Sequence, residues 1–182
     1  QQQIIVVNSS GALAGQTFNA GSSDMTGFEL ETKYAVTDNV QFDFSYYGAE
    51  TEFKSFEITD VRPPLSFTGN KMNYSPERSY NIGMTVFSDD DSSVFTMSYS
   101  HKDSYFMDPS NRFISEQPSY GLLNMSYIKD FRDNLQMKLF CTNCTDQLYL
   151  TQVTTFAVQF GGGGRNYYAN GKRIGLEMTY SF

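Results

Sequence analysis

The residues of this chain that could do covalent or metal chemistry are few. Cys141 and Cys144 form a Cys-x-x-Cys pair, and His101 is the only histidine. On a continuous strand, residues three apart lie about 10 Å from each other and point to opposite faces, whereas a disulfide needs Cα atoms within about 7 Å. We therefore predict two unpaired cysteines at a strand end, unless a turn brings them together. A redox or metal motif is the alternative, but zinc needs about four ligands.

The spacing of possible nucleophiles gives no support for catalysis. No serine or cysteine lies at a recognisable spacing from His101, so we predict no catalytic triad, no enzymatic activity and no cofactor. The run Asp89-Asp90-Asp91 could attract a divalent cation. It is also typical of a solvated turn, which is the interpretation we favour.

Arginine and tyrosine side chains are the candidate binding residues. A guanidinium group suits the recognition of oxyanions, so an anionic small molecule could be bound by arginines. Those in suitable segments are Arg62, Arg112, Arg165 and Arg173. The alternative is that they are solvated charges of loops and rims. Tyr167 and Tyr168 could stack on a ligand, or they could belong to an aromatic belt at a membrane surface.

Composition and charge exclude several classes of protein. The chain has 182 residues with a net charge of −7, which argues against a nucleic-acid partner. No apolar run approaches the roughly 18 residues of a transmembrane helix. Aromatic residues make up 16% of the chain, while hydrophobic residues make up only 40%. This combination favours a β protein whose strands are apolar on one face only.

The last ten residues are the clearest structural signal. From Ile174 onward, every second residue is apolar, ending with Tyr180 and Phe182, and the residues between are small or polar. Such a period of two predicts a strand with one apolar and one polar face. Its length also matches the roughly 9–11 residues with which a tilted strand crosses a bilayer.

The same alternation recurs along the chain. It predicts about eight strands, near residues 4–8, 28–36, 40–47, 80–87, 95–100, 123–128, 135–142 and 173–182. Short turns are expected after Val36, Phe87 and Ile128, with long connections between them. An antiparallel, up-and-down transmembrane β-barrel has this regularity, because its periplasmic turns are short and its extracellular loops are long. We therefore predict an all-β segment of such a barrel.

The parity of the alternation also predicts which residues face lipid. They are Phe28, Leu30, Phe42, Phe44, Ile82, Met84, Phe95, Met97, Met125, Leu139, Leu176 and Met178. The opposite face carries polar and charged residues that a barrel interior would accommodate: Glu29, Glu31, Lys33, Gln41, Asp43, Asn81, Asn124, Gln136, Lys138 and Glu177.

Four stretches carry motifs that occur together in a known family. They are Asn19-Ala20-Gly21 through Gly27-Phe28-Glu29-Leu30-Glu31; Gly69-Asn70-Lys71-Met72-Asn73-Tyr74-Ser75-Pro76; Asn111-Arg112 followed by Tyr120-Gly121-Leu122-Leu123-Asn124; and Asn143-Cys144-Thr145-Asp146-Gln147-Leu148-Tyr149. With Gly164-Arg165-Asn166-Tyr167 and the terminal Phe182, they cover nearly the whole chain. In order and spacing they resemble the C-terminal half of TonB-dependent outer-membrane receptors, although Cys144 stands where leucine is usual.

The resemblance implies what the chain does and what it contains. Residues 1–182 are expected to be the C-terminal portion of a larger receptor barrel, without the plug domain and the TonB-contact segment. The implied function is uptake of a scarce nutrient, such as a ferric siderophore, across the bacterial outer membrane. TonB would act only through the missing N-terminal part. One alternative is an autonomous eight-stranded barrel with a structural or adhesive role. A further alternative is an outer-membrane enzyme with catalytic groups in its extracellular loops, but that would need clustered acidic or histidine residues on adjacent strand ends, and the sequence indicates no such cluster.

The resemblance also implies a role for the last strand in assembly. Leu176, Met178, Tyr180 and Phe182 occupy the places of the signal that the outer-membrane insertion machinery reads. The physical logic is strand addition, in which an exposed edge pairs through its backbone while alternate side chains fill pockets. Alternatively, Phe182 only completes the aromatic belt on the periplasmic side.

Overall fold

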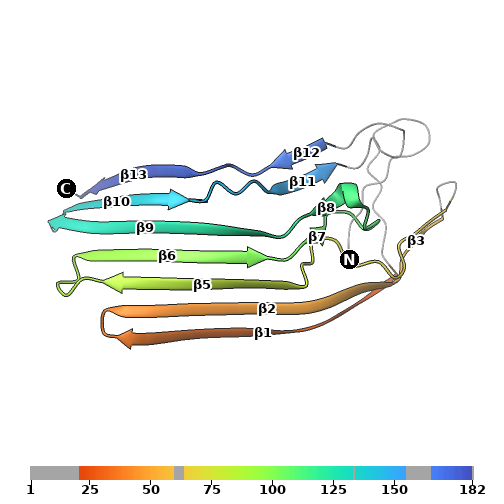
Figure 1. Cartoon of the computed structure of the whole chain (residues 1–182), viewed down its shortest axis with the longest axis horizontal. Coiled ribbons are helices and arrows are strands. Elements are labelled where there is room, and N and C mark those ends of the chain that lie inside the picture. The colour runs from red at the N-terminus through yellow and green to blue at the C-terminus, as the bar shows by residue number, and fades with distance from the viewer. Residues whose placement is uncertain (1–20, 60–63, 133, 155–164, 182) are drawn as a thin grey trace.

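The main body of the protein is one antiparallel sheet. The computed structural model describes residues 21–59, 64–132, 134–154 and 165–181. Seven strands follow one another in sequence order across the sheet (Figure 1). They are β1 (Ser22–Thr37), β2 (Val40–Ser55), β5 (Arg78–Phe87), β6 (Ser93–Lys102), β9 (Tyr120–Arg132), β10 (Leu135–Thr142) and β13 (Arg173–Tyr180). The predicted all-β, up-and-down fold is confirmed, and the strand predicted at residues 4–8 lies outside the described residues.

The sheet is open. Among the described strands, β1 pairs only with β2, and β13 pairs only with β10. The described strands therefore form an open sheet and not a closed barrel. The same part of the chain has one short 3-10 turn, η1 (Phe113–Ser115), and contains no helix that is long and apolar enough to cross a membrane.

The two ends of the sheet differ. The connections β1–β2, β5–β6 and β9–β10 are short and lie together at one end, which we call the turn end (Figure 1). The opposite end, which we call the loop end, carries the long connections and their small elements. These are β3 (Glu57–Ile58), β4 (Leu65–Ser66), β7 (Tyr105–Phe106), η1, β8 (Glu116–Gln117), β11 (Leu150–Thr154) and β12 (Arg165–Tyr168). The predicted alternation of short and long connections is thus confirmed.

Two strands extend further toward the loop end than the alternation indicated. β1 begins at Ser22 and β2 continues to Ser55, whereas the sequence predicted loop at both places. Gly27 lies opposite Ala49, so close that a Cβ on Gly27 would lie 2.3 Å from the Gly48 carbonyl oxygen. Glycines weaken the strand signal in a sequence. At position 27, however, the two backbones approach so closely that only glycine fits.

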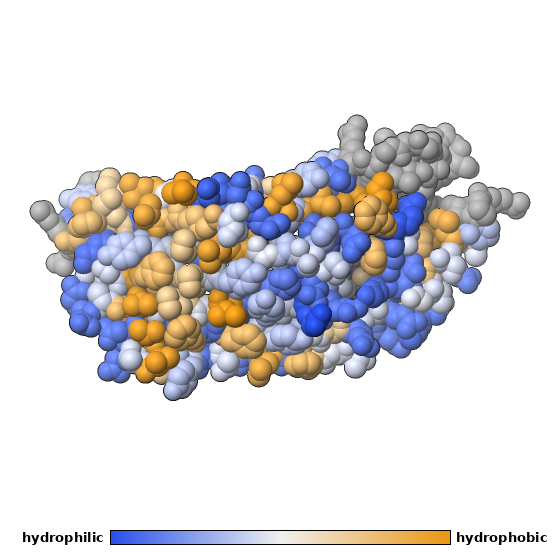
Figure 2. All heavy atoms as spheres, viewed as in Figure 1, coloured by the Kyte–Doolittle hydropathy of each residue, from blue (hydrophilic) through white to orange (hydrophobic). Residues whose placement is uncertain are grey.

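The strand register gathers the apolar residues on one face. Directly paired residues share a face of the sheet, and Tyr34, Phe42, Met84, Met97 and Met125 form one such row across five strands. The register places all twelve residues predicted to face lipid on this same side, which we call the apolar face. Figure 2 shows hydrophobic residues concentrated nearest the turn end and hydrophilic residues toward the loop end.

The opposite side, which we call the polar face, is built from hydrogen-bonding and charged residues. One row consists of Lys33, Asp43, Gly83, Ser98 and Asn124. All ten residues predicted for the barrel interior lie on this face. The predicted division into two faces is therefore confirmed. Because side chains alternate with a period of two, shifting a strand by one residue would move all its side chains to the other face, so the observed register is the one that keeps the two sets apart.

Candidate functional site

The connection between β2 and β5 is a folded body with its own core. Phe53, Phe56 and Ile58 are almost completely buried, and Leu65, Phe67 and Met72 pack against them. The Phe56 ring lies edge-on to the rings of Phe53 and Phe67, each at a centroid distance of 5.0 Å. Each aromatic side chain buries a large apolar area, so these few rings can hold the loop in a fixed shape at the loop end.

A second core joins the β6–β9 connection to β11. Met107, Leu150 and Val153 are buried together, and Tyr105 packs against them. The buried side chain of Gln117 accepts a hydrogen bond from the Leu150 backbone N–H at 2.6 Å. Two connections that are far apart in the sequence are thus held against each other.

Four tyrosines gather where these bodies meet the sheet. The rings of Tyr120 and Tyr149 stack at a centroid distance of 4.5 Å, and those of Tyr74 and Tyr105 lie 6.2 Å apart. Tyr120 pairs with Lys102, and this pair lies on the polar face. Burial raises the pKa of Tyr74 and Tyr105, so their hydroxyls stay protonated at neutral pH.

This group, which we call the tyrosine cluster, was not found by sequence reasoning. Its members come from three connections and one strand end, and no local spacing relates them. Only single members carried a signal in the sequence: Tyr74, Tyr120 and Tyr149 each stand in a different resembling motif, and nothing in those motifs relates them to one another. Protonated phenols combine a ring face for stacking with a hydroxyl that donates or accepts hydrogen bonds. The cluster can therefore contact a partly aromatic, oxygen-rich small molecule.

The predicted arginines that the structure describes come from different elements. Arg62 lies outside the described residues, and Arg165 and Arg173 begin β12 and β13. Arg112 is half-buried beside η1, and its Nε donates a hydrogen bond to Ser110 Oγ at 3.0 Å. Of the predicted arginines, Arg112 is the one whose side chain the described hydrogen bonds orient.

Tyr167 and Tyr168 do not form one stacking surface. They are consecutive residues of β12, so their side chains point to opposite sides of the strand. Tyr168 pairs with Leu150, which belongs to the second core, and Tyr167 pairs with Gln152. Both rings are about half exposed. A ligand could therefore meet one of the two rings but not both from the same side.

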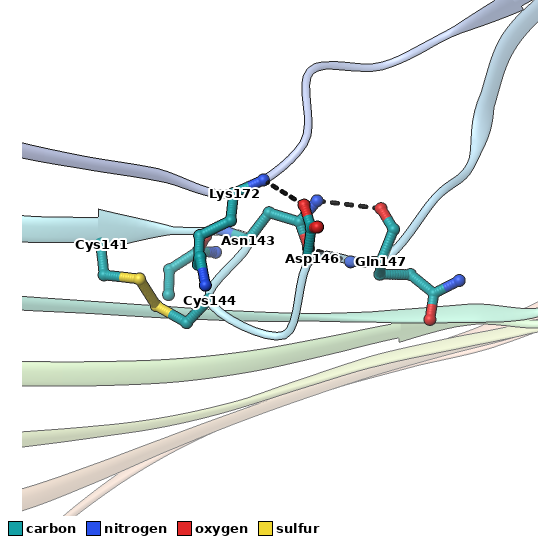
Figure 3. Close-up of a disulfide and its surroundings, with 7 residues drawn as sticks. Cys141, Asn143, Cys144, Asp146, Gln147 and Lys172 are labelled. Atoms are coloured by element: carbon teal, nitrogen blue, oxygen red, sulfur yellow. Dashed lines mark hydrogen bonds between the residues drawn. A yellow bond between two sulfur atoms is a disulfide. The ribbon is translucent and has the colours of Figure 1, made fainter.

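The cysteines correct one expectation. Cys141 and Cys144 form a disulfide, with their Cα atoms 5.6 Å apart (Figure 3). The prediction that they are unpaired is wrong because the chain does not continue as a strand after Thr142. Asn143 adopts a left-handed conformation, with φ of 49°, and begins a turn in which Asp146 N donates a hydrogen bond to Asn143 O at 2.9 Å. Asparagine tolerates this conformation better than other residues with a Cβ.

The turn that contains the disulfide is held by its own side chains. Asn143 is buried; its Oδ1 accepts a hydrogen bond from Gln147 N at 2.8 Å, and its Nδ2 donates to Gln147 O at 2.9 Å. Asp146 Oδ1 accepts a hydrogen bond from Lys172 N at 2.7 Å, which ties the turn to the segment before β13 (Figure 3). The Asn-x-x-Asp-Gln part of the resembling motif thus has a structural role, which is to hold the loop ends of β10 and β13 together.

Asp90, in the middle of the acidic run at the turn end, binds within its own turn. Asp90 Oδ1 accepts hydrogen bonds from Ser88 Oγ at 2.5 Å, Ser92 Oγ at 2.7 Å and Ser92 N at 3.1 Å. These bonds hold the pKa of Asp90 well below its usual range. In the described ranges, no group of three or more His, Cys, Asp or Glu side chains is arranged to hold a metal ion.

Comparison with known proteins gives the family. The family model described as TonB dependent receptor-like, beta-barrel, matches residues 1–144. Among solved structures, the ferric yersiniabactin uptake receptor FyuA from Yersinia pestis is 18% identical with a TM-score of 0.77, covering 92% of this chain and 25% of that one. The siderophore receptor PiuA from Acinetobacter baumannii is 18% identical with a TM-score of 0.71, covering 87% and 22%.

A third solved structure is the ferric citrate transporter FecA, which is 18% identical with a TM-score of 0.67 and covers 88% of this chain and 24% of that one. No curated protein matches the sequence significantly. The chain thus spans about a quarter of the length of the solved structures that it resembles. Two of these similar structures are receptors and the third is a transporter. Because the family model matches more than half of the chain, the chain belongs to the TonB dependent receptor-like β-barrel family.

Proposed function

We propose that this chain forms part of the barrel wall of a receptor that imports a small-molecule cargo, such as a ferric siderophore, across the bacterial outer membrane with energy supplied through TonB. The observation that carries the proposal is the apolar face that runs across all seven strands, opposite a polar face. A soluble protein would cover such a face, whereas lipid covers it in a membrane barrel.

In this proposal the apolar face meets lipid, the turn end faces the periplasm and the loop end faces the outside. The plug and the TonB-contact segment would belong to parts of the receptor outside residues 1–182. The disulfide at Cys141 and Cys144 supports this location. Disulfides form and persist in the periplasm and at cell surfaces, and they are rare in the cytosol.

Cargo would bind at the loop end, on the side of the polar face. The tyrosine cluster supports this location. Tyr120 belongs to the polar face, and Tyr105 and Tyr149 both contact Tyr120. Arg112 would supply a positive charge beside the cluster's loop. Arg165, Tyr167 and Tyr168 remain candidates for further cargo contacts, as does Arg62.

Uptake measurements test the proposal. The complete receptor gene is deleted, and cells are offered radiolabelled ferric citrate, ferric yersiniabactin and a ferric catecholate under iron limitation. We expect uptake of one of these to be lost and to return with the wild-type gene but not with a Tyr105→Ala, Tyr120→Ala double variant. Unchanged uptake of all three by the deletion strain would contradict import of ferric chelates.

We also propose that β13 carries the signal for insertion. Leu176 and Met178 lie on the apolar face of a strand that pairs only with β10 among the described elements, and both are about two-thirds exposed. Tyr180 continues the same face, and Phe182 lies beyond the described residues. Deleting Phe182 in the complete receptor should lower the amount inserted without changing the affinity of inserted molecules for cargo. Normal surface levels would exclude this role.

A further inference from the structure

Two of the long connections at the loop end are joined by one asparagine side chain. Asn111 lies in the connection between β6 and β9, and Lys71 lies in the connection between β2 and β5. Asn111 Oδ1 accepts a hydrogen bond from Lys71 N at 2.7 Å, and its Nδ2 donates to Lys71 O at 3.0 Å. The side-chain amide thus satisfies both backbone groups of Lys71, as a neighbouring strand would.

Two further hydrogen bonds lie along the same seam. Asn70 Nδ2 donates to Pro109 O at 2.7 Å, and Tyr74 N donates to Phe106 O at 2.7 Å. Together these bonds join residues 70–74 to residues 106–111. The two connections are thereby linked by backbone and amide groups, in addition to the packing of each on its own core.

The conformation at Asn111 also calls for asparagine. Its φ of 51° lies in the left-handed region, which asparagine adopts more readily than other residues with a Cβ. Glycine would adopt this conformation but would lack the amide. Aspartate would keep the acceptor oxygen but would lack the donor for Lys71 O. Both the left-handed backbone conformation at position 111 and the two side-chain hydrogen bonds to Lys71 therefore depend on asparagine.

The residue that follows is Arg112, the arginine whose side chain is oriented. Its Nε donates to Ser110 Oγ at 3.0 Å, and Ser110 N donates to Asp108 Oδ1 at 2.8 Å. The Arg112 carbonyl accepts a hydrogen bond from Ser115 N at 2.8 Å. The direction of the guanidinium is thus set by the turn at residues 108–115, which Asn111 fastens to the other connection.

We propose that Asn111 is a positioning residue for cargo recognition. It joins the two connections into one unit, so that Arg112 from one and Tyr74 from the other are presented together to an anionic, oxygen-rich chelate. Tyr74 and Tyr105 already face each other across this seam at 6.2 Å. The ligand named in this inference rests on the proposed function. The joining of the two connections does not depend on it.

The experiment uses the complete receptor in outer-membrane vesicles. We compare a control variant, Asn39→Ala, with three variants at position 111: Asn111→Ala, Asn111→Gly and Asn111→Asp. Asn39 joins two connections at the turn end through Phe87 O and Asp89 Oδ1, and it serves as the matched control. Equilibrium binding of ferric citrate, ferric yersiniabactin and a ferric catecholate is measured. We expect Asn111→Ala and Asn111→Gly to weaken binding about tenfold or more, since the two hydrogen bonds between Asn111 and the Lys71 backbone are lost. We expect Asn39→Ala to leave binding unchanged.

A second readout follows the seam itself. Spin labels at Glu57→Cys and Phe113→Cys, both exposed positions, report the distance between the two connections, while the native disulfide stays unlabelled. We expect a narrow distribution in the wild type and after Asn39→Ala, and a broad one after Asn111→Gly. A narrow distribution in Asn111→Gly, or wild-type affinity in that variant, would overturn the inference. If the wild type binds none of the chelates, the proposed cargo fails, and the distance distribution alone decides whether Asn111 joins the connections.

Discussion

Replacing Leu176 by arginine tests the membrane-facing role of the apolar face directly. Leu176 lies near the middle of β13, opposite Leu139, with 64% of its surface exposed in this chain. In a bilayer that surface would contact hydrocarbon. An arginine near the midplane of a membrane barrel costs about 2–4 kcal/mol. The equilibrium constant for unfolding from the bilayer should therefore rise about 30- to 900-fold.

The measurement is urea-induced unfolding of the complete receptor from lipid vesicles, with the folded fraction read by its heat-modifiable mobility in gels. The matched control is Thr179→Arg, which places the same side chain on the polar face of the same strand, opposite Gln136. The control should lose less than about 1 kcal/mol, because a wet interior tolerates charge. Equal losses in the two variants, or a wild-type midpoint for Leu176→Arg, would refute the assignment of the faces.

Two further outcomes are expected at the two ends of the sheet. Replacing Cys141 and Cys144 by serine should lower the free energy of unfolding by about 2 kcal/mol, the loop-entropy value for so short a ring. In the wild type both thiols should resist alkylation until a reductant is added, and alkylation without reductant would contradict the bridge. The carboxylate of Asp90, whose pKa is lowered by its turn, should support that turn fully above its unfolded pKa of about 3.9. The support should fade only as pH falls through the lower folded pKa. Hydrogen exchange at Ser92 N should therefore remain slow at pH 4, and early loss of protection there would contradict the lowered pKa.

The sequence alone predicted the strands and their faces because the signal for both is local. Alternation at Ile174, Leu176 and Met178 needs no knowledge of any other segment, since side chains of a strand point to opposite sides in turn. The short turns were equally local, because clusters such as those around Asp38 and Asp90 interrupt apolar alternation. The loop-side extensions of β1 and β2 were missed because Gly27 and Gly48 weaken the pattern where the two backbones come close.

The candidate site could be predicted only in part. Arg112 was found by its residue type, and the motif that ends at Tyr149 was found by resemblance. The stacking of Tyr149 on Tyr120 was not predicted, nor was the contact between Tyr74 and Tyr105. These contacts join residues from different connections, and no spacing within one segment encodes them.

The tertiary structure decided how the loops are built. A positive φ at Asn143 began a turn and brought Cys141 to Cys144, against the geometry of a continuous strand. A positive φ at Asn111 likewise turned a side-chain amide toward the Lys71 backbone. The period of a strand is fixed by the backbone of each residue and can be read from the sequence. The partner of a loop residue depends on which distant segment the sheet brings beside it, and only the folded chain determines that.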